Sequence, residues 1–139
     1  MPQLKLSYFD IHGGRAEPIR LALAIGGVAF EDHRFTFPEF AEVRKTVPFG
    51  QVPVLHVDGA QVTQSDAMLR YAGKLAGLYP ADAYQALLCD EVAYVVEEAG
   101  VKLGPTFSMK GDEQKAARIA LVNSSMPVYL GWLQKQLLA

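Results

Sequence analysis

The first third of the chain alternates between a strand pattern and a helix pattern. Residues 4–8 carry apolar side chains at every second position, which predicts a strand with one buried face. A helix is expected over residues 15–25, with a proline in its first turn and a Gly-Gly pair as a stop signal. Its core contacts are expected from Ile19, Leu21, Leu23 and Ile25. Residues 30–35 read as a second strand, so the first unit is β-α-β.

Residues 49–66 hold two further strands and the start of a helix. Apolar residues run from Val54 to Val57, and Asp58-Gly59 is a dipeptide typical of tight hairpins. A helix follows over residues 65–76, with its buried side formed by Met68, Leu69, Tyr71 and Ala72. Residues 38–45, ahead of the hairpin, are expected to form a helical turn or a loop. These elements predict an α/β domain over residues 1–77 with a mixed four-stranded sheet.

Strand patterns end near residue 80, and an all-α segment is expected over residues 82–139. Asp82 is placed to cap a helix that runs to about residue 102. Its apolar stripe would comprise Leu87, Leu88, Val92, Val95, Val96 and Ala99. After a break at Gly104-Pro105, a second long helix is expected over 112–138, kinked or interrupted by Pro127.

Composition narrows the class of protein further. Half of the 139 residues are apolar and a fifth are charged, as in soluble globular domains. A net charge of −2 gives no electrostatic case for binding nucleic acid or an anionic membrane. No apolar run is long enough to span a bilayer, and the N-terminus begins a strand instead of a signal peptide, so a cytoplasmic protein is expected. The single Cys89 excludes an internal disulfide, and its apolar neighbours predict a buried side chain.

Pro53 and Ser65 point to a binding site for a peptide with a free carboxylate. Proline has no N–H for a sheet ladder, so Pro53 at a strand start should leave the peptide groups of Val52 unpaired. The bond between these two residues can be cis or trans, and a cis bond would turn the Val52 backbone toward an extended ligand. Ser65 is expected to cap the following helix, whose first N–H groups favour a carboxylate.

Three segments follow one another along the chain: Y-F-D-I-H-G-G-R-A-E-P-I-R at residues 8–20, P-F-G-Q-V-P-V-L at residues 48–55 and Q-S-D-A-M-L-R-Y at residues 64–71. In this order they resemble the tyrosine-type cytosolic glutathione transferases, most nearly the sigma class. The resemblance implies a thioredoxin-like N-terminal domain followed by an all-helical domain. In that family the helical domain continues through several more helices, so a shortened helical domain is expected here.

The resemblance also implies an enzyme that activates the thiol of glutathione for attack on small, electrophilic, largely apolar substrates, a detoxification reaction. It assigns to Tyr8 a hydrogen bond that stabilises the thiolate, which is the nucleophilic form. Arg15 resembles the family arginine that adds positive charge beside the tyrosine. The loop between these two residues is one residue longer than usual in the family. No metal and no cofactor are expected, with glutathione acting as co-substrate.

The same resemblance assigns contacts with the rest of glutathione to residues in several segments. The peptide part would pair with the backbone of Val52 ahead of Pro53, assisted by Gln51. The γ-glutamyl carboxylate would meet Gln64 and Ser65 at the start of the helix.

The remaining contacts implied by the resemblance involve the glycine carboxylate and a partner subunit. Phe40 and Arg44 stand where the family has a tryptophan and a lysine that bind the glycine carboxylate. Across the interface of a homodimer, Glu98 is the best match for an acidic residue that meets the partner's γ-glutamyl amine, with Glu97 as an alternative. Phe49 resembles an aromatic dimer anchor of some classes, although a place in the core stays open.

Two other functions remain open from the sequence. One is an isomerase that uses glutathione on a prostaglandin-type lipid peroxide, which sigma-like members resemble. The other is a non-catalytic binding or structural module on the same scaffold. A thioredoxin-like disulfide enzyme is excluded, because the loop after the first strand carries no cysteine pair.

Overall fold

A computed structural model describes residues 1–138 of the chain. The chain divides into two compact units, Met1–Ala81 and Asp82–Ala139. The first unit contains every strand among the described residues, and the second is built from helices.

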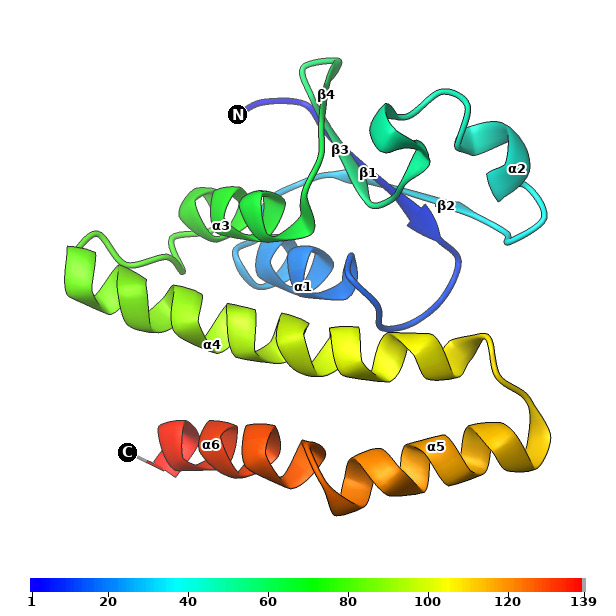
Figure 1. Ribbon diagram of the computed structural model, residues 1–139. Coiled ribbons are helices and arrows are strands. Elements are labelled where there is room, and N and C mark those ends of the chain that lie inside the picture. The colour runs from blue at the N-terminus through cyan, green and yellow to red at the C-terminus, as the bar shows by residue number, and fades with distance from the viewer. Residues whose placement is uncertain (139) are drawn as a thin grey trace. The chain divides into compact units, whose positions relative to one another are not determined.

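The first unit is organised by a four-stranded sheet in the order β2-β1-β3-β4. Its strands are β1 (Leu4–Phe9), β2 (Glu31–Phe35), β3 (Val54–Val57) and β4 (Ala60–Val62). β1 pairs in parallel with β2 and antiparallel with β3, and β4 pairs antiparallel with β3 (Figure 1). The predicted mixed sheet is therefore confirmed. Asp58 and Gly59 both have positive φ, 50° and 87°, as the tight hairpin between β3 and β4 requires.

Two helices cover one face of this sheet. They are α1 (Glu17–Ile25) and α3 (Ser65–Leu75), which pack against each other. The core between helices and sheet contains Leu4, Leu6, Tyr8, Ile19, Leu23, Leu55, Met68 and Ala72. Leu69 and Tyr71 pack at its margin as partly buried residues. One face of β1 is therefore buried, as its alternation predicts, and Tyr8 at the end of this face belongs to the core.

The buried face of α1 differs from the prediction. Leu21 and Ile25 are 52% and 71% exposed, whereas Ile19, Ala22 and Leu23 are buried. Positions two apart lie about 200° apart around a helix, so the four predicted residues could not share one face. The fourth buried position belongs to a charged residue, Arg20.

Aromatic residues gather around Phe9, whose side chain leaves β1 on the opposite side from that of Tyr8. Its ring centroid lies 5.2 Å from that of Phe35 on β2 and 5.0 Å from that of Phe40 on the short helix α2 (Phe40–Val43). Phe37 stacks on it at 4.5 Å. The segment after β2 is thus anchored to the end of β1 by ring contacts.

An ionic network ties α1 to β2. Asp32 accepts hydrogen bonds from Arg20 Nε at 3.0 Å and from Arg34 Nε at 2.8 Å. Burial of Asp32 disfavours its charged form, but hydrogen bonds and charges from Arg34 and Arg20 outweigh this and hold the pKa of Asp32 below its ordinary value. The network thus stabilises the carboxylate form.

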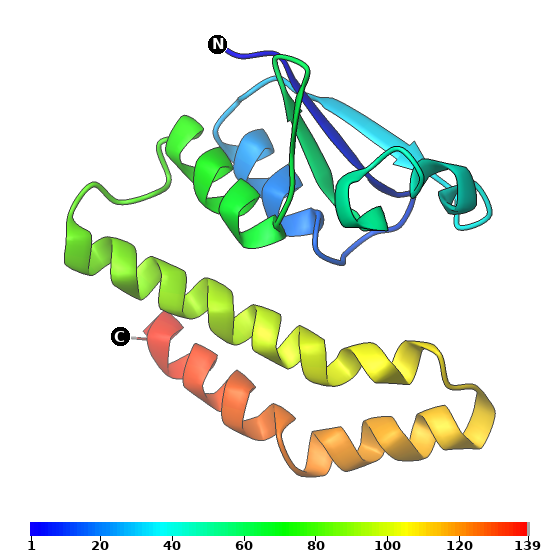
Figure 2. The ribbon, with the colours of Figure 1, turned by 45° about the horizontal axis from the view of Figure 1, so that its top comes forward.

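The second unit is an antiparallel helical arrangement. Its long helix α4 (Ala83–Leu103) lies beside α5 (Gly111–Asn123) and α6 (Met126–Leu138) in both views (Figures 1 and 2). Asp82 caps α4 as predicted, since its carboxylate accepts from the Gln85 N–H at 2.9 Å. A 3-10 helix, η2 (Gly104–Phe107), forms the turn. Among the described residues of this unit, only Thr106 is buried.

One prediction for the helical unit needs correction, because Cys89 is exposed and not buried. The apolar stripe of α4 around it is also exposed, with Leu87 and Val96 60% and 48% exposed. Apolar neighbours in the sequence indicate that a side chain is buried only where another element of the fold covers that face of the helix. The second long helix is interrupted at residues 124–125, as expected near Pro127. This proline lies in the first turn of α6, where proline is tolerated.

Asp32→Asn should make the stability of the first unit less dependent on pH. Because the folded pKa of Asp32 is depressed, its contribution is present above the unfolded value of about 3.9 and is lost as pH falls through the folded value. At pH 7 the variant should lose about 1–2 kcal/mol of unfolding free energy through its weakened charged hydrogen bonds. At pH 3 the difference should shrink.

The measurement is urea unfolding at both pH values, followed through NMR signals of core residues in the first unit. The control is Glu42→Gln, because the Glu42–Lys45 pair is solvent-exposed and should contribute little. Parallel pH profiles for wild type and Asp32→Asn would contradict the role given to the network.

Candidate functional site

Strand register brings three of the predicted segments to one end of the sheet. Ser7 pairs with Val54 at the last paired position of β1 and β3, and continuing that register sets Tyr8 opposite Pro53. In the hairpin of β3 and β4, Leu55 pairs with Val62. Continuing that register sets Gln64 opposite Pro53. Neighbouring strands lie about 4.8 Å apart, so the three segments are adjacent.

The loop after β1 folds back onto the hydroxyl group of Tyr8. The backbone N–H of Arg15 donates a hydrogen bond to the Tyr8 hydroxyl oxygen at 3.3 Å. Gly14 has φ +70°, and a Cβ atom built there would lie 2.6 Å from the same oxygen. The Tyr8 ring is only 8% exposed, so the loop and the core fix its orientation. The longer loop therefore still places Arg15 next to Tyr8, through its main chain.

Val52 lies beyond the last pair of the β1–β3 ladder, and the Val52-Pro53 peptide bond is cis. Among the described backbone hydrogen bonds outside helices and strands, none involves the N–H or the carbonyl of Val52. Gln51 is exposed and follows the 3-10 helix η1 (Pro48–Gly50), in which Phe49 has φ 58° and is 77% exposed. Phe49 is therefore a surface residue, and the alternative of a place in the core is wrong. The unpaired main chain that was expected at Val52 is present.

The start of α3 differs in detail from the prediction. The N-cap residue is Gln64, with φ 73° and ψ 104°, and no side chain caps the helix. Ser65 already has helical geometry as the first residue of α3, so its predicted role as the cap is wrong. The first helical bond runs from Met68 N–H to Gln64 O at 3.1 Å, so the amides before it lie outside the helical ladder. No described hydrogen bond uses the Ser65 hydroxyl.

Arg44 lies against the turn that leads into Pro53. Its guanidinium carbon is 5.7 Å from the Phe40 ring centroid. A Cβ atom built at Gly50 would lie 3.5 Å from Arg44 O and 3.7 Å from Arg44 Nε. Phe40, Arg44 and the η1 turn are thus brought together, and the Arg44 side chain remains exposed to solvent.

Glu98 belongs to the helical unit and is already engaged there. Its carboxylate accepts a hydrogen bond from the Tyr129 hydroxyl at 2.7 Å, and Lys102 Nζ lies 5.7 Å from the Tyr129 ring centroid. The hydrogen bond to Glu98 raises the pKa of Tyr129, because a phenolate there would face a carboxylate, while Lys102 acts in the opposite direction.

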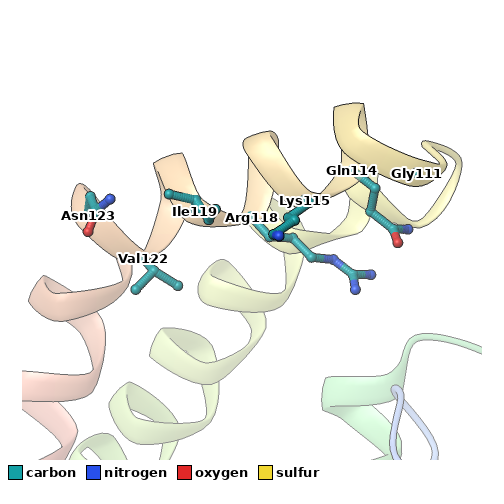
Figure 3. Close-up of a pocket in the computed structure, with 7 residues that line it drawn as sticks. All are labelled: Gly111, Gln114, Lys115, Arg118, Ile119, Val122 and Asn123. Atoms are coloured by element: carbon teal, nitrogen blue, oxygen red, sulfur yellow. The ribbon is translucent and has the colours of Figure 1, made fainter.

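A shallow hollow of the helical unit lies along α5 (Figure 3). Its lining residues are Gly111, Gln114, Lys115, Arg118, Ile119, Val122 and Asn123. None of the residues predicted to bind glutathione is among them. Within residues 1–138, no group of three His, Cys, Asp or Glu side chains is placed to hold a metal ion. None of the described helices has both the length and the apolar character to cross a bilayer.

Two residues of the site were missed by sequence reasoning. Gly14 contacts Tyr8 closely, and the Gly-Gly pair after His12 was the available signal. Arg20 lies under the Tyr8 ring, with its guanidinium carbon 5.8 Å from the ring centroid. Its signal was a charged residue within the apolar face formed by Ile19 and Leu23.

Residues 4–74 match the family model described as the glutathione S-transferase N-terminal domain. A glutathione S-transferase of Anopheles gambiae is 36% identical over 131 residues, which are 94% of this chain and 64% of that protein. A solved structure of prostaglandin synthase D of Nilaparvata lugens is 36% identical with a TM-score of 0.84, covering 94% of this chain and 65% of that one. A sigma-class glutathione S-transferase of Fasciola hepatica is 29% identical with a TM-score of 0.82, covering 94% and 64%.

The sheet, its helices and the following all-helical segment define the fold of a thioredoxin-like domain followed by an all-helical one. The chain belongs to the glutathione S-transferase family, with relatives that include the sigma class. It spans 64–65% of the length of the relatives named above.

Gly14→Ala should disturb Tyr8 far more than Gly13→Ala does. Both glycines have positive φ, so alanine costs backbone strain of about 1 kcal/mol or more at either position. Only at Gly14 would the new methyl group also meet the Tyr8 hydroxyl, whereas Gly13 has open space. The NMR signals of Tyr8 and the Arg15 amide should therefore shift strongly in Gly14→Ala and little in Gly13→Ala. Equal shifts in the two variants would contradict this close approach.

Proposed function

We propose that this chain acts as a glutathione S-transferase with Tyr8 as the group that stabilises the thiolate. The observation that carries the proposal is the fixed Tyr8 hydroxyl, which accepts the Arg15 N–H at the end of the sheet where Pro53 and Gln64 converge. With its oxygen accepting that bond, the hydroxyl proton is available for donation to the sulfur of glutathione. One charge-assisted hydrogen bond of about 1.5–3 kcal/mol lowers a thiol pKa by one or two units.

In the proposed reaction the thiol loses its proton to solvent and the sulfur lone pair attacks an electrophilic carbon. A carbon–sulfur bond forms, and either a leaving group departs with its electron pair or the π electrons of a double bond move to the far atom of the electrophile, which takes a proton from water. Arg15 adds positive charge beside the developing thiolate. Glutathione is the co-substrate, and no metal or other cofactor enters the proposal.

The rest of glutathione would use the groups around this end of the sheet. The Val52 main chain before Pro53 is proposed to pair with the peptide, with Gln51 beside it. Gln64, Ser65 and the first amides of α3, which lie outside the helical ladder, would receive the γ-glutamyl carboxylate. Arg44 beside Phe40 would bind the glycine carboxylate, because a guanidinium matches a carboxylate through two parallel hydrogen bonds.

The oligomeric state and the cellular location are proposed from what is typical of the family. A cytoplasmic homodimer that detoxifies small electrophiles is proposed, with Glu98 meeting the partner's γ-glutamyl amine and exposed Phe49 as a candidate anchor. Sedimentation of the purified chain tests the dimer. The activity itself is tested by calorimetric titration with glutathione while thiolate absorbance is followed. A folded chain without binding would favour the non-catalytic module.

A glutathione-dependent isomerase is the second candidate, favoured by the similarity to prostaglandin synthase D of Nilaparvata lugens. Its reaction would rearrange a lipid endoperoxide without net oxidation, with glutathione regenerated at the end. Product analysis with a prostaglandin endoperoxide tests it. An isomer yield no higher than the uncatalysed background would exclude this activity.

Tyr8→Phe should lower turnover by about 10- to 100-fold while leaving glutathione affinity nearly unchanged. The hydroxyl acts on thiolate ionisation, and each unit of thiol pKa corresponds to about 1.4 kcal/mol. Turnover with an electrophile and calorimetric affinity are measured together. The control is Tyr71→Phe, which removes a hydroxyl from a partly buried tyrosine of α3. Equal losses of affinity and turnover in Tyr8→Phe would indicate a structural role.

Ser65→Ala should weaken glutathione binding by about 1–2 kcal/mol without changing the unfolding free energy. Stability is unaffected because the Ser65 hydroxyl does not cap α3. Asp82→Ala provides the opposite pattern, since it removes a real cap and should cost about 1 kcal/mol of stability with no loss of affinity. Unchanged affinity in Ser65→Ala would remove this serine from the site.

A further inference from the structure

Arg20 is a buried charge that the proposed thiol chemistry does not use. It is 6% exposed, on the face of α1 that Ile19 and Leu23 turn toward the core. Arginine is rarely buried unless it is paired, because removing its charge from water is costly. Such a residue in the core of a small unit therefore calls for a specific explanation.

The contacts of Arg20 converge on Tyr8 and on the loop that follows it. Its Nη1 donates to Glu17 Oε2 at 3.1 Å and to the Ile11 carbonyl at 3.4 Å, and its Nε donates to Asp32. Its Nη2 is buried without a hydrogen-bond acceptor. The guanidinium carbon lies 5.8 Å from the centroid of the Tyr8 ring, whose negative face attracts a cation.

The Ile11 carbonyl is the point where this network holds the loop. Arg34 Nη1 donates to the same oxygen at 3.4 Å and also to Asp10. Further along the same loop, the Arg15 amide meets the Tyr8 hydroxyl. The loop is thus fixed at its beginning by two guanidinium groups and at its end by the phenol oxygen.

We propose that Arg20 is a positioning residue for the Tyr8 hydroxyl. Its guanidinium holds the Tyr8 ring from one side and the Ile11 carbonyl from the other, and this sets the distance at which the Arg15 amide meets the phenol oxygen. It also offsets the carboxylates of Glu17 and Asp32, whose charge would otherwise oppose a thiolate nearby. The inference rests on the proposed function for its catalytic consequence, but the geometric part applies to the protein without glutathione.

The test uses Arg20→Lys, which keeps the charge but lacks the planar fork that binds several acceptors at once. Hydrogen exchange is measured by NMR in the unliganded protein at the Arg15 amide and at the core amides of Leu6 and Leu55. We expect the Arg15 amide to exchange about tenfold faster, as the loss of about one hydrogen bond predicts, with the core amides unchanged. Lys5→Gln is the control, because it breaks an exposed ion pair between β1 and β2 that does not involve Arg20.

The catalytic consequence is measured with glutathione bound. Arg20→Lys should raise the pKa of the bound thiol and lower turnover while leaving the affinity for glutathione unchanged. Arg20→Met should raise the thiol pKa further, because it also removes the charge. Should the methionine variant fail to fold, the lysine variant decides the question alone.

Two results would overturn the inference. One is wild-type exchange at the Arg15 amide in folded Arg20→Lys. The other is an equal acceleration at Arg15, Leu6 and Leu55, which would make Arg20 a purely structural residue. If the wild-type chain binds no glutathione, the proposed function fails, while the exchange rates of the unliganded protein still decide the role of Arg20.

Discussion

The antiparallel pairing of β3 on both of its sides is the constraint on which the candidate site depends. Its register with β1 places Tyr8 opposite Pro53, and its register with β4 places Gln64 opposite the same proline. A slip of one residue in the pairing of β3 with β1 would turn Leu55 out of the core, because side chains alternate between the two faces of a strand. Burial of Leu55, which is 1% exposed, therefore fixes the position of Tyr8 opposite Pro53.

The same end of the sheet is where the backbone departs from regular structure. Phe49 and Gln64 are non-glycine residues with positive φ, 58° and 73°, which costs about 1–3 kcal/mol each. They flank the paired strands, and the core residues Leu55 and Met68 hold the elements that follow them. Such conformations persist only where surrounding packing determines them. Here they leave the main chain around Val52 and the first amides of α3 outside the ladders, so a rigid core supports groups that a ligand can use.

How much the sequence predicts depends on whether a feature is local. The period of two along β1 and the Asp58-Gly59 turn are local signals, and they predict the sheet correctly. Of the two predicted helix caps, one is right and one is wrong for the same reason. Asp82 has an extended backbone and caps α4, whereas the conformation of Gln64 makes Gln64 the N-cap of α3 and Ser65 its first helical residue. The place of Arg20 could not be predicted, because its partners Asp32 and Ile11 come from other elements. The exposure of Cys89 also depends on what covers α4, which its neighbours in sequence do not reveal.

The two units are stabilised by different contacts. This difference separates the proposed ionisation of the thiol from the proposed recognition of the electrophile. The first unit buries an apolar core of its own, while the turn of the helical unit is held by Thr106, which donates to Leu103 O and accepts from Arg118 Nε at 3.1 Å. Apart from Glu98, every group proposed to ionise the thiol or bind glutathione lies within Met1–Ala81. The proposed thiol ionisation would therefore depend on a unit with its own core and a fixed strand register. In this proposal recognition of the electrophile is a separate requirement, so a defect in it would lower turnover without changing the pKa of the bound thiol.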